Sequence, residues 1–242
     1  MDKAKIGTWI TTYNTSALDV ISKCNFDWIC IDMEHSSITL EQLENLLNVL
    51  DKNGSNSFVR VSDNNKTEIK KVLDLGAKGI IVPMVNTASE AKNAISYANY
   101  PPKGQRGYAL ARAQGFGYGL KGYEKISKNI KVVVQIETAK AIDNLESILK
   151  VKGIHSTLIG PRDLSGSIGK PGNYTDKKFL KALQKYEQVS RKNKVSMGMH
   201  VAYPETDTLN KFINKGYKFL AIGTDMTFLG DTIREKIKKI KK

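Results

Sequence analysis

The 242-residue sequence contains only two cysteines and three histidines, and no apolar run approaches the roughly 20 residues of a membrane-spanning helix. The cysteines, Cys24 and Cys30, have neither the CxxC spacing nor the second pair of a zinc site or disulfide framework. We therefore expect reduced, partly buried thiols. The opening residues MDKAKIGTW contain no apolar signal core. These absences predict a cytoplasmic protein with no membrane partner.

Negative charge is also in short supply. The chain has 24 Asp and Glu against 38 Lys and Arg, which gives a net charge of +14 and a pI near 9.6. Such a balance can indicate a nucleic-acid-binding protein, but the lysines are scattered and no RRM, KH, OB or helix-turn-helix pattern is present. Only residues 234–242 are dense in positive charge. We expect a Lys-rich surface that attracts carboxylate substrates and no nucleic-acid partner, with a non-catalytic basic binding protein as the alternative.

Short β-rich runs alternate with longer amphipathic ones along the whole chain, and several of the short runs are continuously apolar, as strands buried on both faces are. Eight strands with intervening helices in 242 residues predict an α/β fold: one (β/α)8 TIM barrel domain over residues 1–242. The expected strands are Ile6–Thr11, Trp28–Met33, Ser57–Val61, Gly79–Val85, Lys131–Ile136, Ser156–Gly160, Lys194–His200 and Phe219–Gly223.

The helical patterns between the strands have recognisable ends. Capping boxes begin at Thr39 and Thr87, and Gly54, Gly76 and Gly216 stand where helices should stop. One stretch, residues 99–124, breaks the alternation with two prolines and six glycines. Because its tyrosines and phenylalanine interleave with two arginines, we expect an ordered loop there.

The active site of a (β/α)8 barrel lies at the carboxyl ends of its strands, and these ends carry a short, very polar set of side chains. Two of the three histidines fall on this rim. In strand order the set is Asp32, Glu34 and His35; Arg60; Gln135 and Glu137; Arg162 and Asp163; His200; and Asp225.

Several of these side chains also have structural interpretations. Asp32 could cap the following helix, and Glu137 and Asp163 could stabilise helix dipoles. Arg60 could neutralise the carboxylates, and His200 could make a structural hydrogen bond. His155 precedes the sixth expected strand, away from the rim, and we assign it no function.

Taken together, the set indicates metal chemistry. Carboxylates with a glutamine, without cysteine or His-x-x-His spacing, favour a hard octahedral cation, Mg²⁺ or Mn²⁺, over zinc. A fixed arginine such as Arg60 suits a carboxylate held in its planar fork. An α-keto acid would chelate the cation with its keto and carboxylate oxygens. No lysine stands at a strand end, which argues against a Schiff base.

The chain resembles a known family in the runs DWICIDMEH, FVRVS, VLDLGAKGIIVPMV, YPPKGQRG, VVVQIET and IGPRDLSGSIG. They are similar to the class II pyruvate aldolases of the HpcH/HpaI type, which include 4-hydroxy-2-oxoheptanedioate aldolases and 2-keto-3-deoxy-sugar-acid aldolases. The resemblance covers almost the whole chain. It implies a metal-dependent aldolase that cleaves a 4-hydroxy-2-oxo acid to pyruvate and an aldehyde, assembled as a homo-oligomer (trimer or hexamer), with Mg²⁺, Mn²⁺ or Co²⁺ as cofactor.

The resemblance also implies roles for individual residues. His35 would be the base, Arg60 the group that stabilises enolate charge, and Asp74 the residue that raises the basicity of the histidine. We add Asp32 to this catalytic set from its place on the rim. Glu137 and Asp163 match the metal ligands. Gln135 and the backbone of Arg162 match substrate contacts. From their places on the rim, we expect Asp163 and His200 to bind substrate as well. Asp74 ends a helix at the opposite rim, so it would have to come from a neighbouring subunit.

The sequence departs from the family pattern at three places. The leading helix is short or missing, Arg162 stands where a small residue is frequent, and His200 stands where some relatives have an apolar residue. The last two would reshape the aldehyde pocket. An alternative on the same scaffold is a citrate lyase- or malyl-CoA lyase-like enzyme, for which no segment indicates a nucleotide site.

Overall fold

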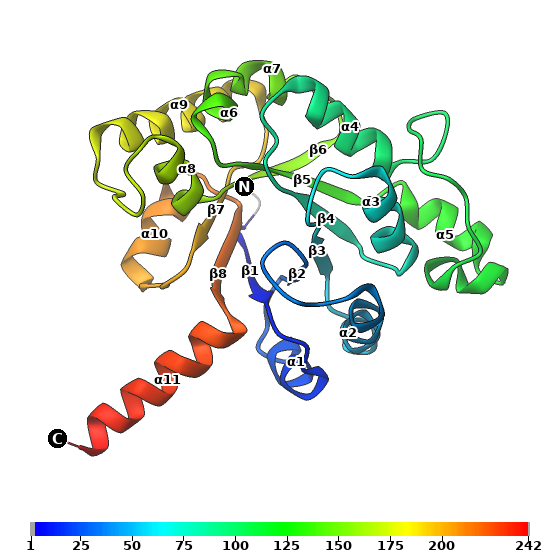
Figure 1. The fold of residues 1–242 in the computed structure, drawn as a ribbon, viewed down its shortest axis with the longest axis horizontal. Helices are drawn as coiled ribbons and strands as arrows, with labels where there is room; N and C mark the ends of the chain where they lie inside the picture. Colours follow the sequence, from blue (N-terminus) through cyan, green and yellow to red (C-terminus); the bar gives the residue numbers. More distant parts are fainter. Residues whose placement is uncertain (1–2, 242) are drawn as a thin grey trace.

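The computed structural model describes residues 3–241 and contains a closed barrel of eight parallel strands in chain order. Figure 1 looks into this barrel, with helices arranged around it. The predicted (β/α)8 fold is therefore confirmed. The strands are β1 Lys5–Ile10, β2 Trp28–Asp32, β3 Ser57–Arg60, β4 Gly79–Val82, β5 Lys131–Ile136, β6 Ile154–Ile159, β7 Gly198–Val201 and β8 Phe219–Thr224.

Helices follow the strands, and three of the connections, β4–β5, β5–β6 and β6–β7, contain more than one helix. They are α1 Thr15–Ser22, α2 Leu40–Lys52, α3 Lys66–Asp74, α4 Ala88–Ala98, the 3₁₀ helix η1 Arg112–Gly117, α5 Leu120–Ser127, α6 Ala139–Asp143, α7 Leu145–Leu149, α8 Pro161–Ser167, α9 Lys177–Asn193, α10 Thr206–Asn214 and α11 Asp225–Ile240. No helix within residues 3–241 has the length and apolar character needed to cross a membrane.

Two apolar clusters hold the barrel together, because alternate strand residues point inward and outward. The inner cluster is aromatic at the amino-terminal end, where Trp28, Phe58 and Phe219 contact one another and Trp28 stacks on Phe219 at 4.2 Å between ring centroids. The outer cluster packs the strands against the helices with buried aliphatic side chains. Since Phe58 faces inward, Arg60 two residues later also faces the barrel interior.

Most of the predicted boundaries are correct to within two residues, and the exceptions have local causes. β4 ends at Val82, earlier than predicted, because Pro83 follows and Met84 adopts a left-handed backbone with φ of 53°. β7 begins at Gly198 because Lys194 still belongs to the left-handed cap of α9. The prediction that His155 precedes β6 was wrong: it is the second residue of that strand, at the amino-terminal end.

The segment 99–124 is ordered, but it is not the uninterrupted loop that the sequence predicted. It contains η1 and the first half of α5, which the glycines had concealed. Both predicted capping boxes are present, at Thr39 and Thr87. Both thiols are free; Cys30 is buried, whereas Cys24 is exposed, contrary to expectation.

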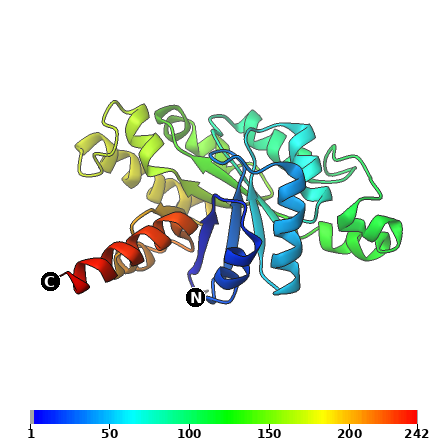
Figure 2. The same ribbon diagram turned by 60° about the horizontal axis from the view of Figure 1, so that its bottom comes forward.

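The last helix, α11, is unlike the others. Figures 1 and 2 show that it projects away from the barrel instead of lying along it. None of its residues is buried. The outer face of the barrel between α10 and α1 is consequently not covered by the helix that follows β8.

Candidate active site

Arg60 stands at the centre of the carboxyl-terminal rim, at the end of β3. Its Nε donates to Asp32 Oδ1 at 2.8 Å and its Nη2 to Asp32 Oδ2 at 2.6 Å, a two-pronged ion pair. Burial by itself lowers the pKa of Arg60, but the hydrogen bonds and charge of Asp32 and then of Glu34 outweigh it and raise that pKa. Arg60 is therefore a fixed, permanent positive charge at the mouth of the barrel.

Glu34 belongs to the rim predicted from the sequence, but no role was assigned to it there. Its Oε2 lies 3.0 Å from Arg60 Nη1 and 3.6 Å from His35 Nε2. Burial raises the pKa of Glu34, the charge of Arg60 opposes this, and Asp32 and Asp163 raise it further. The signal available in the sequence was only its place beside His35 at the end of β2.

His35 is exposed at the rim, and its main chain is held by the strand below it. The backbone N–H groups of Glu34 and His35 both donate to Asp32 Oδ1, at 3.0 and 3.4 Å. Asp32 thus fixes Arg60 and the loop that carries the histidine at the same time. The imidazole itself, 65% exposed, is open to an incoming molecule.

Trp9 and His200 lie beneath Arg60, inside the barrel. The Arg60 guanidinium lies 4.6 Å above the Trp9 ring, and the Trp9 and His200 rings are 5.6 Å apart. Burial and the charge of Arg60 lower the pKa of His200 to about 4, so its ring is neutral at neutral pH. The indole N–H of Trp9 and Nε2 of His200 are buried without a hydrogen-bond partner in the described part of the chain.

Glu137 follows β5 and is buried on the same rim. Its Oε1 accepts a hydrogen bond from the backbone N–H of Met84 at 2.6 Å, and its Oε2 accepts one from Gln135. Burial raises the pKa of Glu137; the two hydrogen bonds oppose this, and the negative charges of Glu34 and Asp163 add to it. Gly160 leaves room for this pair, since a Cβ there would lie 2.7 Å from Glu137 Oε2.

Asp163 and Arg162 occupy the first turn of α8, directly after β6, and both are exposed. Asp163 lies near enough to Glu34 and Glu137 for its charge to affect both carboxylates. The structure thus groups Asp32, Arg60, Gln135, Glu137, Asp163 and His200 on one rim with His35.

Asp74 is not part of this group within one chain. It ends α3, where Arg106 Nη2 donates to its Oδ1 at 2.7 Å. Arg106 is fully buried, lies over the ring of Tyr100 and donates to the hydroxyl of Tyr123. In the single chain Asp74 therefore anchors segment 99–124 to the barrel.

The oxygen atoms of the rim fit a divalent cation. Three carboxylates, Glu34, Glu137 and Asp163, repel one another here, and the buried Gln135 Oε1 has no hydrogen-bond partner among the described residues. A hard cation would offset the repulsion and accept such an oxygen as a ligand. Residues 3–241 contain no cluster of three or more His, Cys, Asp or Glu that could hold a metal ion. Water or substrate oxygens would therefore have to complete the coordination.

Comparison with known proteins agrees with this geometry. A model of the HpcH/HpaI aldolase/citrate lyase family matches residues 5–231. A 2-dehydro-3,6-dideoxy-6-sulfogluconate aldolase of Pseudomonas putida is 31% identical over 98% of this chain and 93% of its own length. A 2-keto-3-deoxy-L-rhamnonate aldolase of Escherichia coli is 30% identical over 99% of this chain and 90% of its own length.

A solved structure shows the same fold. The crystal structure of an HpcH/HpaI aldolase/citrate lyase family protein from Burkholderia cenocepacia J2315 superimposes with a TM-score of 0.94 at 25% identity. The superposition covers 99% of this chain and 95% of the Burkholderia chain.

Proposed function

Because the chain belongs to the HpcH/HpaI aldolase/citrate lyase family and is thus a carbon–carbon lyase, we propose that it cleaves a 4-hydroxy-2-oxo acid to pyruvate and an aldehyde, and catalyses the reverse addition. The observation that carries this proposal is the fixed cation of Arg60 beside the carboxylates Glu34 and Glu137 on one rim. The cation can stabilise the negative charge of an enolate, and the acidic groups on the same rim can hold the metal that a keto acid chelates.

The residues proposed to hold the metal are Glu137 and Asp163, with Mg²⁺ or Mn²⁺ as the expected ion and Co²⁺ as a substitute. When bound, such an ion would polarise the C2 carbonyl of the keto acid. Gln135 and the backbone of Arg162 would bind the same part of the substrate. Glu137 is already oriented by Met84 and Gln135 in the chain itself.

The proton transfers are proposed to involve His35. Its exposed imidazole would remove the C4 hydroxyl proton, directly or through water. The C3–C4 bond then breaks, the aldehyde leaves, and Arg60 stabilises the pyruvate enolate until C3 takes up a proton. Asp74 would support His35 only from a second copy of the chain, since its own carboxylate lies on Arg106.

The substrate class is proposed to be the 2-keto-3-deoxy-sugar acids. The two named relatives act on acids of this type, one bearing a sulfonate and one derived from rhamnonate. The positively charged chain would attract such anions. The side chains of Arg162 and His200 are the places where the aldehyde specificity of this chain would differ.

A homo-oligomer, trimer or hexamer, is proposed as the working form. In support, α11 exposes a stripe of apolar side chains and the barrel face between α10 and α1 lacks its own covering helix (Figure 1). Exchange of α11 between two copies would bury both surfaces. The stripe consists of Met226, Leu229, Ile233, Ile237 and Ile240.

Metal removal is the experiment that tests the function. Dialysis against EDTA should abolish pyruvate release from a 2-keto-3-deoxy-sugar acid, and Mg²⁺, Mn²⁺ or Co²⁺ should restore it; Glu137→Gln should need more metal for the same rate. Mass spectrometry of products from a panel of aldehydes with pyruvate identifies the substrate. Full activity after exhaustive chelation, or a pyruvate adduct trapped by borohydride, would contradict the proposal.

A further inference from the structure

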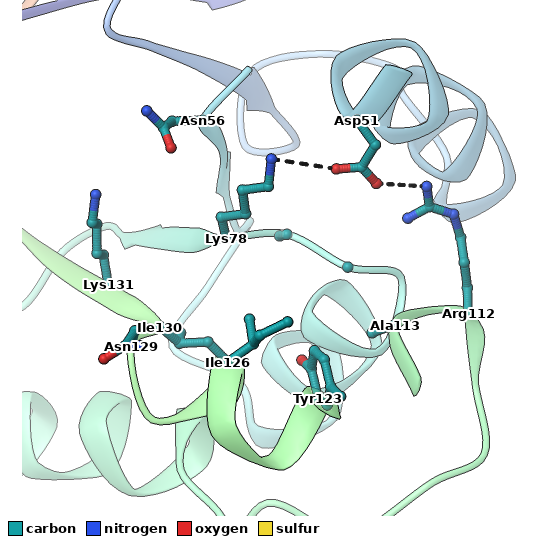
Figure 3. A pocket seen from close by; sticks show the side chains of 12 residues that line it. Asp51, Asn56, Lys78, Arg112, Ala113, Tyr123, Ile126, Asn129, Ile130 and Lys131 are labelled. Atoms are coloured by element: carbon teal, nitrogen blue, oxygen red, sulfur yellow. Dashed lines mark hydrogen bonds and ion pairs between the residues drawn. The ribbon is translucent and has the colours of Figure 1, made fainter. Parts of the chain in front are cut away.

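A cavity of about 460 Å³ lies at the amino-terminal end of the barrel, opposite the candidate active site. Figure 3 shows it between the starts of β4 and β5 on one side and η1 and α5 on the other. Its volume falls within the usual range for small-molecule sites. The lining residues are Asp51, Asn56, Gly76, Ala77, Lys78, Arg112, Ala113, Tyr123, Ile126, Asn129, Ile130 and Lys131.

The polar wall of the cavity has an excess of positive charge. Asp51 is the one carboxylate among the lining residues, and it pairs with both Arg112 Nη2 at 2.7 Å and Lys78 Nζ at 3.6 Å. The third cation, Lys131, has no acidic partner within residues 3–241; its ammonium lies 6.0 Å from the Phe58 ring centroid. The lining therefore carries a net charge of +2, three cations less one carboxylate.

Lys131 also lines a second cavity at the amino-terminal end of the barrel. This smaller cavity of about 70 Å³ shares Lys131 and Asn56 with the first and is also lined by His155. Burial, and after it the charge of Lys131, lower the pKa of His155. The amino-terminal end of the barrel thus holds an unneutralised ammonium group beside an amide side chain and open space.

The opposite wall of the cavity is apolar. Ile126 of α5 and Ile130, in the turn between α5 and β5, line it (Figure 3), and Ile126 is 61% exposed. Ala77 and Ala113 also line the cavity, and their small side chains leave space in it. A ligand that binds favourably to both the positively charged wall and the apolar wall needs an anionic head group and an apolar body.

We propose that this cavity is a second binding site, separate from the active site, for a small organic anion. The head group, a carboxylate or a phosphate, binds Lys131, Lys78 and Asn56, and the apolar body lies on Ile126 and Ile130. Charge-assisted hydrogen bonds supply the affinity for the head group, and burial of the apolar body adds to it.

A ligand in this cavity would hold segment 99–124 and the rest of α5 more tightly against the barrel. The cavity wall formed by Tyr123 belongs to the network around Arg106 and Asp74, because the Tyr123 hydroxyl accepts from Arg106 and donates to the Leu73 carbonyl. A ligand between α5 and the starts of β4 and β5 therefore stabilises the segment that contacts Asp74. Binding should raise the melting temperature by mass action.

The test uses three probes with one aromatic body: benzoate, phenyl phosphate and the uncharged benzyl alcohol. Isothermal titration calorimetry on the full-length assembled protein should show binding of one or both anions at millimolar concentration and none of the alcohol. The stronger anion distinguishes a carboxylate from a phosphate ligand. Lys131→Gln should weaken binding about tenfold or more, the effect of losing one charge-assisted hydrogen bond.

Two further variants make the result specific. Ile126→Trp, at an exposed position, should block the cavity without disturbing the fold, and Lys128→Gln, which changes a lysine of the same segment outside the cavity, should bind like the wild type. Aldol cleavage without probes should be unchanged in all three variants. No anion binding to the wild type, or binding that survives both Lys131→Gln and Ile126→Trp, would overturn the proposal.

Discussion

At the residue scale, Arg60 is the most constrained side chain of the rim. Asp32 binds two of its nitrogens, Glu34 lies beside the third, and the Trp9 ring covers one face of the guanidinium. Such a planar fork keeps its position when a substrate arrives, which a flexible ammonium group does not. Pre-oriented charge of this kind is what stabilises an enolate without reorganisation.

Arg60→Lys should therefore preserve the fold and lower aldol cleavage by roughly 10²–10³-fold, the scale of losing one oriented donor. Exchange of the C3 protons of pyruvate, followed by NMR in deuterated water, should fall in parallel because both reactions pass through the enolate. If Arg60 were only a counter-ion for the carboxylates, exchange would stay nearly normal and only metal affinity or melting temperature would change.

His200 gives a prediction about pH. Its pKa of about 4 lies below the ordinary value near 6.5 because the ring is buried and close to Arg60. The unfolded chain takes up this proton near pH 6.5, and the folded chain only near pH 4. Stability present at neutral pH is therefore lost as the pH falls through that window, by roughly 3 kcal/mol at most.

The measurement is urea unfolding of the wild type and His200→Leu at the two ends of the window. The variant should lose less stability between neutral pH and pH 4.5, since it lacks the titrating ring. Equal losses in the two proteins would show that His200 does not titrate abnormally.

At the scale of elements, Asp225 joins the first and last strands at the rim. As the first residue of α11, it accepts hydrogen bonds from the backbone N–H and hydroxyl groups of Thr11 and Thr12, four in all. These bonds join the residues that follow β1 to the first residue of α11, next to the backbone pairing of β1 with β8.

Asp225→Ala should lower the free energy of unfolding by about 3 kcal/mol, because it removes a charged acceptor and leaves partly buried donors unpaired. Asp225→Asn should cost less, since the amide oxygen still accepts two of the four bonds. Asp231→Ala, which removes an exposed carboxylate of the same helix, serves as the control and should change stability by about 0.5 kcal/mol or less. If denaturant unfolding shows that Asp231→Ala loses as much stability as Asp225→Ala, Asp225 does not stabilise the barrel in this way.

At the scale of the whole molecule, α11 packs little against the barrel of its own chain. The helix has no buried residue, and Leu229, Ile233 and Ile237 are each about half exposed. Apolar side chains in a row on a projecting helix are typical of a surface that another chain covers.

Ile233→Glu should therefore shift the proposed homo-oligomer toward the 26.9 kDa monomer, because it places a charge in the apolar stripe. Lys238→Glu, which introduces the same residue on the opposite face of α11, should leave the assembly intact. Size-exclusion chromatography with light scattering measures both. A wild-type protein that is monomeric at micromolar concentration would exclude the proposed oligomer.

The sequence alone determined the architecture and most of the rim, because strand periodicity and the closure of eight strands leave few ways to arrange the chain. Arg60, Gln135 and Glu137 were found at strand ends simply because parallel strands end at one edge. The family resemblance added Asp74, which no pattern of strand ends would have selected.

Only the tertiary structure decided which side chains share an environment. Trp9 joined the site, and Glu34 of the predicted rim was found to pair with Arg60, because β1, β2 and β3 bring these side chains together. Contacts between strands are not encoded in any local pattern. The neutral His200 follows from burial, which depends on every neighbouring strand. The cavity beside Lys131 likewise exists because α5 lies across the starts of β4 and β5. The sequence does not specify how far α5 lies from these strands.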